Sequence, residues 1–336
     1  MAVLFLLCGK PIFINSSLFQ AITSFLLMRF YTYKEIELEL QASNKGMPIS
    51  FNYRIKLLVF LVIDLRKVRY EELLPHEIVE ERLKTPIAYL PIGLLEWHGP
   101  HLAVGNDALK VHALAIRVAQ QGGGLVFPPL FYGENREHNL MEFDQLDHDK
   151  IIDKMALSKE SFKPGYMRKP SYQQDAFYIE LLLHILYEIE SLGFEVIVIL
   201  AGHYPLLHHA RETIKEYAKN GKAKAWALSG YELVRDVIPE AGDHAAKWET
   251  SLLLILRPDC VDMSQLPKDR NSPLIGVIGT DPRDTTKEFG EFAVNTLVDR
   301  IVACAHQFLK LQRQKSKANN VDRPYVHPSK LQSKDE

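Results

Sequence analysis

The sequence predicts an α/β protein in which helices cover both faces of a mostly parallel sheet, giving a three-layer α/β/α arrangement. Short apolar segments, such as residues 86–92, 194–200 and 223–228, alternate with longer amphipathic segments, such as residues 176–191 and 206–219. Uninterrupted apolar runs of strand length are typical of strands that are buried on both faces of a parallel sheet. Their alternation with helical segments indicates parallel strands joined by helices.

Three regions are expected along the chain. Residues 61–310 contain the alternating segments and form the main domain. Residues 1–60 form an N-terminal extension, whose apolar runs are shorter than the roughly 18 residues of a membrane-spanning helix. We favour a poorly ordered extension, or a start site assigned too far upstream, over a signal or anchor segment. Residues 311–336 are polar and are expected to be an exposed tail or an arm that packs on a neighbouring subunit.

The composition favours a soluble enzyme. The chain has 336 residues, of which 47% are hydrophobic, and a formal net charge of -2, which suits one large core. A charge near zero without basic clusters disfavours nucleic-acid binding. The three cysteines, Cys8, Cys260 and Cys304, have no C-x-x-C spacing, so we expect neither a disulfide framework nor a thiolate zinc site. The protein is therefore expected to be cytoplasmic and to bind neither nucleic acid nor membrane.

The segment EWHGPHLAVGND, which runs from Glu96 to Asp107, predicts a metal site at the end of a strand. Glu96 and His98 follow the apolar run 86–92, and residues two apart on an extended segment point the same way. The Gly-Asn pair before Asp107 allows the chain to fold back toward them. Carboxylates and imidazoles together are ligands suited to Zn, Mn or Fe.

Three separated motifs resemble, in the correct order, the signature of the creatininase (creatinine amidohydrolase) family. They are EWHGPHLAVGND, the GHY that follows residues 194–201, and DHAAKWETS at residues 243–251. Ala103 and Asn106 depart from the usual proline and threonine of the first motif, but neither change removes a ligand. The resemblance runs from about residue 64 to residue 305 and implies a creatininase-like fold and a metal-dependent hydrolase. It also implies a homo-oligomer, commonly a hexamer.

The resemblance implies a ligand set of Glu96, His98, Asp107, His203 and Glu249. In such a set Asp107 is the candidate for a bridge between two cations. The cations of two-metal sites lie about 3.5 to 4 Å apart and can share a hydroxide that attacks a carbonyl. One metal would be held by Glu96 and His203, and the other by His98. Creatininase itself has a further glutamate ligand where this chain has proline at position 205, so Glu249 is expected to complete the second site. We predict two divalent ions per chain, with one ion as the alternative.

His244 is the candidate for proton transfer. A histidine with an ordinary pKa near 6.5 can act as a general acid or base at neutral pH. The alternative is that His244 only caps the helix that contains Glu249. His101 is expected to be a structural, hydrogen-bonded histidine and not a ligand.

The candidates for substrate binding are Glu134, Arg136, Glu137, His138 and Tyr204. The first four lie in a segment that resembles the loop bordering the substrate in the family, although an exposed charged loop is an equally good interpretation. The segment before His244 lacks the tryptophan that covers creatinine in creatininase, so creatinine is not the expected substrate. We favour a polyhydroxylated ring ketone, as in the 3-dehydro-scyllo-inosose hydrolases of inositol catabolism. The alternatives are an amidohydrolase or deformylase acting on C-N bonds, an isomerase or lyase, and a non-catalytic binding protein.

Overall fold

The computed structural model describes residues 3–7, 10–14, 66–133, 147–163 and 165–321. The chain divides into two compact units, Met1–Arg66 and Lys67–Glu336. The first unit contains an antiparallel pair of strands, β1 (Val3–Leu7) and β2 (Lys10–Ile14). Within the described residues, no helix has the length and apolar character needed to cross a membrane.

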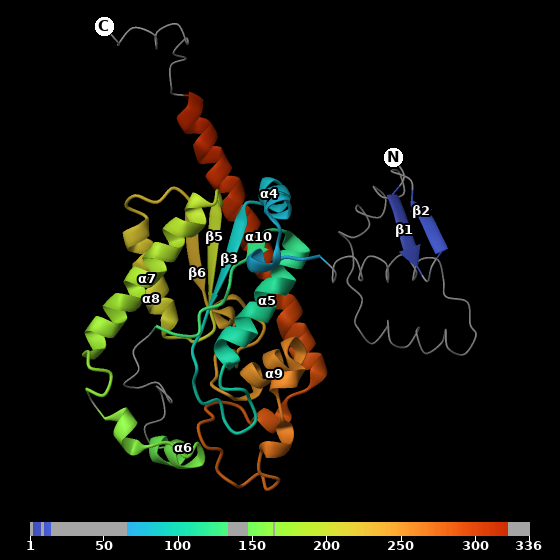
Figure 1. Ribbon diagram of the computed structural model, residues 1–336. Coiled ribbons are helices and arrows are strands. Elements are labelled where there is room, and N and C mark those ends of the chain that lie inside the picture. Colours follow the sequence, from blue (N-terminus) through green and yellow to red (C-terminus); the bar gives the residue numbers. More distant parts are fainter. Residues whose placement is uncertain (1–2, 8–9, 15–65, 134–146, 164, 322–336) are drawn as a thin grey trace, which may run out of the picture. The chain divides into compact units, whose positions relative to one another are not determined.

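The second unit is built around a four-stranded parallel sheet with the strand order β4-β3-β5-β6 (Figure 1). The strands are β3 (Ile87–Ile92), β4 (Leu125–Val126), β5 (Val196–Ala201) and β6 (Lys224–Leu228). All six residues of β3 and of β5 are buried, because helices cover both faces of the sheet. The expected strands at residues 86–92, 194–200 and 223–228 are therefore confirmed to within two residues.

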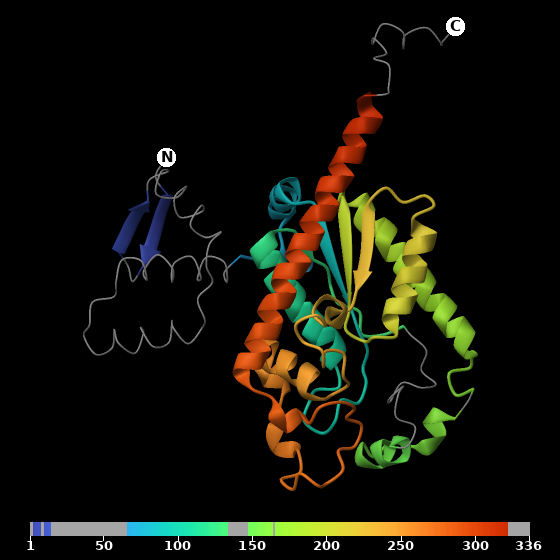
Figure 2. The ribbon, with the colours of Figure 1, turned by 180° about the vertical axis from the view of Figure 1, so that it is seen from behind.

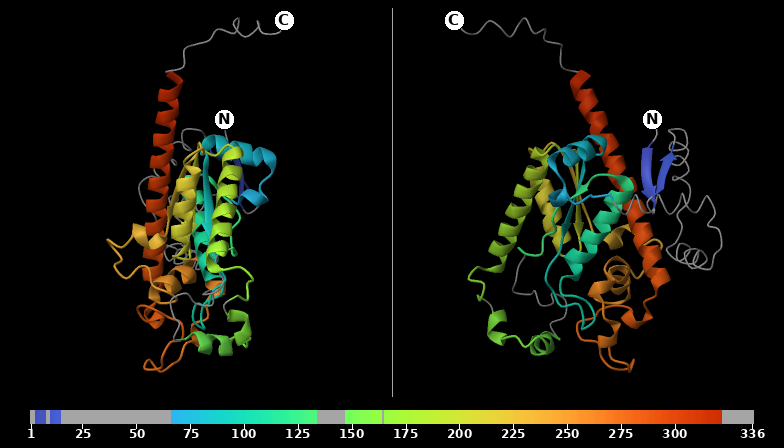
Figure 3. Two further views of the ribbon diagram at one scale, coloured as in Figure 1. Left: turned by 90° about the vertical axis from the view of Figure 1, so that its left-hand side faces the viewer. Right: turned by 45° about the vertical axis from the view of Figure 1, so that its right-hand side comes forward.

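Helices form a layer on each face of this sheet. One layer contains α5 (Asn106–Gly122), α9 (Lys247–Leu256) and α10 (Lys287–Val321), and the other contains α7 (Ser171–Ser191) and α8 (Leu206–Tyr217). Seen edge-on, α10 and α7 lie on opposite sides of the sheet (Figure 3), and the view from behind shows α10 crossing the sheet face (Figure 2). The predicted three-layer α/β/α arrangement is confirmed.

The core is divided by the sheet according to the alternation of side chains along each strand. Ile87 and Tyr89 of β3 pack with apolar residues of α5, α9 and α10, whereas Ala88 and Leu90 pack with those of α7 and α8. Successive side chains of a strand point to opposite faces, so one apolar run supplies both cores. The sheet is thus fixed from both sides, which gives the residues that follow its strands a rigid support.

Shorter elements complete the second unit. The helices α4 (Pro75–Lys84) and α6 (His148–Lys154) precede the first strand of the sheet and the helix α7, respectively. The 3-10 helices among the described residues are Tyr70–Glu72, Lys159–Phe162, Gly230–Leu233, Pro258–Cys260, Met263–Gln265 and Pro282–Asp284.

The C-terminal helix α10 continues beyond position 311, where the sequence predicts a polar tail. It extends to Val321. Gln312 donates a hydrogen bond to the carbonyl of Lys222 at 2.6 Å, and Arg313 lies 3.3 Å from the carboxylate of Glu195. The sequence of a helix that is polar on most sides is similar to that of an exposed tail. The two contacts that hold this part of α10 join residues that are 90 and 118 positions apart, so local sequence does not reveal them.

Two glycines allow the first turn of α5 to pack directly on the ends of β3 and β5. A Cβ atom at Gly93 would lie 2.3 Å from the backbone nitrogen of Ala108, and one at Gly202 would lie 2.1 Å from the carbonyl oxygen of Asp107. Both distances are shorter than van der Waals contact allows. The two glycines therefore bring Asp107 next to the residues that follow both central strands.

Gly202→Ala is expected to lower the free energy of unfolding by about 1–3 kcal/mol, the usual cost of overpacking. The added methyl group would overlap a backbone carbonyl, which cannot rotate away as a side chain can. Urea denaturation would measure the change. Gly230→Ala is the matched control, since its Cβ would meet only side-chain atoms of Leu297 and Trp248 at 3.3 Å or more. Equal losses in the two variants would contradict the proposed close approach.

Candidate metal centre

The five predicted ligand residues meet at one edge of the sheet. Glu96 and His98 lie in the loop after β3, Asp107 lies in the first turn of α5, His203 follows β5, and Glu249 lies in the first turn of α9. None of the five side chains is more than 4% exposed. This is the carboxyl edge of the parallel strands, where open α/β sheets place their ligand sites.

Glu96, Asp107 and His203 form the first ligand group. His203 Nδ1 lies 3.0 Å from Glu96 Oε2 and 3.3 Å from Asp107 Oδ2. A tetrahedral metal with bonds of about 2.0 Å separates its ligand atoms by about 3.3 Å. The spacing therefore suits a divalent transition metal.

His98, Asp107 and Glu249 form the second ligand group. His98 Nε2 lies 3.1 Å from Asp107 Oδ1 and 3.5 Å from Glu249 Oε2. Asp107 thus offers one carboxylate oxygen to each group. This is the arrangement that a bridging carboxylate requires, and it places each residue in the group that the family resemblance implies.

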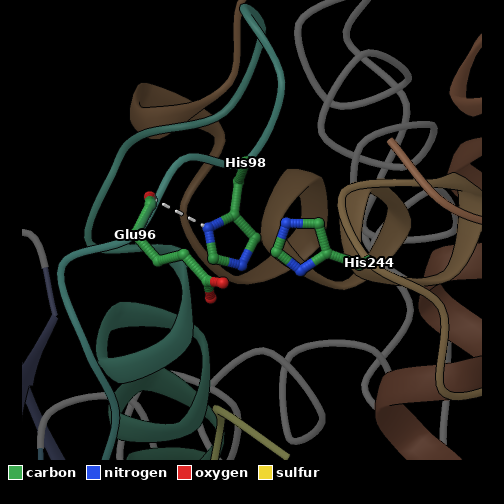
Figure 4. A group of neighbouring side chains, drawn as sticks. All are labelled: Glu96, His98 and His244. Atoms are coloured by element: carbon green, nitrogen blue, oxygen red, sulfur yellow. Dashed lines mark hydrogen bonds between the residues drawn. The ribbon is translucent and has the colours of Figure 1, made fainter. Parts of the chain in front are cut away.

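His98 and His244 lie next to each other, with Glu96 beside them (Figure 4). Their rings stack with centroids 4.4 Å apart. His98 Nδ1 lies 3.2 Å from the carbonyl oxygen of Glu96, which leaves Nε2 as the ligand atom. His244 Nε2 lies 2.9 Å from the carbonyl oxygen of Trp97. Because a carbonyl only accepts, Nε2 of His244 carries a hydrogen, and Nδ1 is the nitrogen that can bind or release a proton.

Two buried ligand atoms support the assignment of a metal centre. His98 Nε2 and Asp107 Oδ2 make no hydrogen bond with the described residues, although other polar atoms lie within 3.5 Å of each. Buried polar atoms without hydrogen bonds are costly, so such atoms usually have another partner. The oxygen and nitrogen donors present here fit Zn or Mn.

The site is electrostatically prepared for a cation. Burial raises the pKa of Glu96 and of Asp107, but nearby histidines outweigh burial, and both pKa values are lowered. Burial lowers the pKa of His98, yet Asp107 and Glu249 raise it to about 9. Burial and the neighbouring His98 lower the pKa of His244. The carboxylates of Glu96 and Asp107 are thus ionised at neutral pH.

A cavity of about 780 Å³ adjoins both ligand groups. Asp107, His203 and Glu249 line it together with the predicted catalytic residue His244 and the predicted substrate-binding residue Tyr204. Burial raises the pKa of the Tyr204 hydroxyl well above 10, so this group remains a hydrogen-bond donor at neutral pH. The remaining lining residues are Gly202, Glu240, Gly242, Asp243, Ile278, Gly279 and Thr280. The volume is in the range of small-molecule sites.

Asp243 caps helix α9, the role considered as an alternative for His244. Its carboxylate accepts hydrogen bonds from the backbone N–H groups of Trp248 at 2.7 Å and Glu249 at 3.1 Å. Burial and the nearby Glu249 raise the pKa of Asp243 to about 7. Two residues of the motif DHAAKWETS therefore have different roles. Asp243 holds the start of α9, and His244 lies beside His98.

The remaining candidates have different outcomes. Glu134, Arg136, Glu137 and His138 lie outside the described residues, so their place in the substrate pocket stays a prediction. His101 Nε2 lies 2.9 Å from the hydroxyl oxygen of Thr250, which agrees with a structural role.

Lys110 is a charged residue of the site that the sequence analysis missed. Its ammonium is hydrogen-bonded to Glu249 and lies 3.7 Å from Asp107 Oδ1. Burial lowers the pKa of Lys110, but the Glu249 and Asp107 carboxylates outweigh burial and raise it. The feature of the sequence that could have pointed to Lys110 is its position three residues after Asp107, which places both residues on the same face of α5.

Fold and site together define a three-layer α/β protein with a carboxylate and histidine centre at the sheet edge. The family model described as creatininase, creatinine amidohydrolase, matches residues 71–144 and 171–305. The chain therefore belongs to the creatininase family, as its motifs predict.

Related proteins agree with this family. Creatinine amidohydrolase of Pseudomonas putida is 27% identical over 197 residues, which cover 54% of this chain and 68% of the relative. The mycofactocin precursor peptide peptidase of Mycolicibacterium smegmatis is 28% identical over 244 residues, which cover 65% of this chain and 85% of the relative. Both relatives are hydrolases, so the predicted class of enzyme is confirmed at the level of the family.

Solved structures of creatininase share the fold. A crystal structure of creatinine amidohydrolase matches with a TM-score of 0.55 and 23% identity, covering 72% of this chain and 98% of that chain. A manganese form matches with a TM-score of 0.54 and 23% identity over the same shares. A mutant of Zn-Zn type matches with a TM-score of 0.53 and 22% identity, also over the same shares.

Proposed function

We propose that this protein is a metal-dependent hydrolase that attacks a carbonyl group of a small cyclic substrate. The observation that carries the proposal is the pair of ligand groups sharing Asp107 beside a cavity of about 780 Å³. A divalent metal bound there, Zn or Mn with Fe as a further option, would polarise a carbonyl and lower the pKa of a water molecule. The protein contributes ligands held on the ends of rigid strands and on helix starts.

The ligand roles follow the two groups. Glu96 and His203 would hold one cation, His98 and Glu249 would hold the second, and Asp107 would belong to both. The side chain of the proline at position 205 has no atom that can bind a metal, and Glu249 lies in the second group, where it can supply the missing carboxylate. Two cation positions are therefore proposed, with a single occupied position as the alternative.

His244 is proposed to transfer the proton. Its Nε2 is held by the carbonyl of Trp97, and its ring stacks on His98 at the wall of the cavity. A general acid or base needs this kind of fixed position within reach of the reacting atoms. Nδ1 would accept the proton of the attacking water as the new C–O bond forms, and would deliver it to the group that departs when the neighbouring C–C or C–N bond of the substrate breaks.

The proposed substrate is a polyhydroxylated ring ketone of inosose type. The residues that line the cavity include Tyr204, Glu240, Asp243 and Thr280, whose side chains carry hydroxyl or carboxylate groups, and groups of these kinds pair well with substrate hydroxyls. The second candidate is cleavage of a C-N bond, because both curated relatives are named for reactions on such bonds. A homo-oligomer remains the expected assembly, and no nucleic-acid or membrane partner is proposed.

The test is a substrate screen combined with metal analysis. Protein purified without chelators would be incubated with inosose-type ketones, cyclic amides and short peptides, and the products would be weighed by mass spectrometry. We expect a product heavier than the substrate by one water molecule, or two fragments that together contain one added water. Activity should be lost on chelation and return with Zn or Mn. A product of unchanged mass would indicate an isomerase, and metal binding without any turnover would favour a binding protein.

A further inference from the structure

Lys110 is a buried cation inside the proposed metal centre. It lies on α5, one turn after Asp107, and is 3% exposed. Lysine is almost never this buried unless its charge is paired. Its ammonium is hydrogen-bonded to Oε1 of Glu249 and lies 3.7 Å from Oδ1 of Asp107. Lys110 is therefore paired with two of the three residues of the second ligand group.

Each oxygen of the Glu249 carboxylate already has a hydrogen-bond partner. Oε1 accepts from Lys110, while Oε2 accepts the backbone N–H of Ala245 at 2.9 Å and lies 3.5 Å from His98 Nε2. Oδ1 of Asp107, the oxygen that belongs to the second group, is the one nearest to the ammonium. In the first group, by contrast, the carboxylates of Glu96 and Asp107 are each paired with His203, at 3.0 Å and 3.3 Å.

The summed charge of the site also favours a single divalent cation. Among the five proposed ligands and Lys110, with His98 and His203 neutral as metal ligation requires, the carboxylates of Glu96, Asp107 and Glu249 carry three negative charges and Lys110 carries one positive charge. The remaining charge of -2 matches one divalent cation. A second divalent cation would bring the summed charge to +2. It would also lie beside the ammonium of Lys110, and these two positive charges would repel each other in a buried site of low dielectric constant.

We propose that the ammonium of Lys110 takes the place of the second divalent cation. This inference rests on the proposed function for the existence of the metal centre. The first group then binds one divalent metal tightly, and the second group, already balanced by Lys110, binds a further ion at least about tenfold more weakly. The chain works with one metal and one ammonium where the ligand geometry alone has two cation positions.

The test is a count of metal ions in variants of Lys110. Wild-type protein, Lys110→Met and Lys110→Gln would be dialysed against increasing Zn²⁺ and then Mn²⁺, and bound metal would be measured by plasma mass spectrometry. Lys110→Arg keeps the charge. Lys215→Met is the matched control, because Lys215 is also paired with a glutamate, Glu212, but is exposed on the surface of α8. Circular dichroism would verify folding.

We expect one tightly bound equivalent in wild-type protein, Lys110→Arg and Lys215→Met, and two in Lys110→Met or Lys110→Gln. Two equivalents of similar affinity in the wild type would overturn the inference and leave the proposed function standing. One equivalent in every folded variant would also overturn it. A wild-type protein that takes up no metal would reject the proposed function itself. The wild-type titration is decisive even if an uncharged variant does not fold.

Discussion

Asp107→Ala is expected to remove most of the bound metal and, with it, the hydrolase activity. Asp107 is the one residue that contributes to both ligand groups, with Oδ2 facing His203 and Oδ1 facing His98. Loss of a residue that only orients a ligand typically lowers metal affinity about 10–100-fold, so loss of this shared ligand should lower it by more than about 100-fold. The measurement is metal content per chain after dialysis against metal-free buffer.

The control for this experiment is Asp149→Ala, since Asp149 is an exposed aspartate paired with Lys159 on the surface. It should keep full metal content. Asp107→Asn provides a further comparison, because it preserves the shape of the side chain and removes its charge. If Asp107→Ala folds and retains as much metal as Asp149→Ala, then the centre does not depend on the shared carboxylate and both ligand groups must be redrawn.

The sequence predicts those parts of the fold and site that depend on local pattern. Continuous apolar runs identify β3 and β5 because both faces of these strands are covered. Glu96, His98 and Asp107 are close in sequence, so their convergence follows from a strand end and a turn. His203 and Glu249 lie farther along the chain, and the resemblance of their motifs to the family connected them with the same centre.

The contacts that the sequence did not predict join distant positions. Lys110 and Glu249 are 139 residues apart, and a lysine on a helix is usually assumed to face solvent. The packing of Gly202 against the backbone of Asp107 likewise depends on how α5 crosses the ends of the strands. Asp243 lies three residues before Ala246, the N-cap position of α9, so its hydrogen bonds to the start of this helix depend on the turn between them.

His244→Ala is expected to retain the bound metal and to lower kcat by about 10²–10⁴-fold, the usual contribution of a general acid or base. The substitution removes the proton-transferring Nδ1 but leaves the five proposed ligands in place. His208→Ala is the control, because His208 is an exposed histidine on α8. Steady-state kinetics on the substrate found in the screen, together with metal content, would measure the effect.

The pattern of the kinetic changes separates the roles open to His244. A fall in kcat with little change in KM indicates loss of an interaction made in the transition state, whereas a rise in KM alone would indicate a binding role. Loss of metal would instead make His244 a ligand, in agreement with its position beside Glu96 and His98. Partial recovery of His244→Ala by added imidazole would support proton transfer directly, because the free base could enter the cavity that the side chain lines. Normal turnover in this variant would reject the assignment and move the search for the proton donor to the other ionisable groups of the cavity wall, Asp243 first.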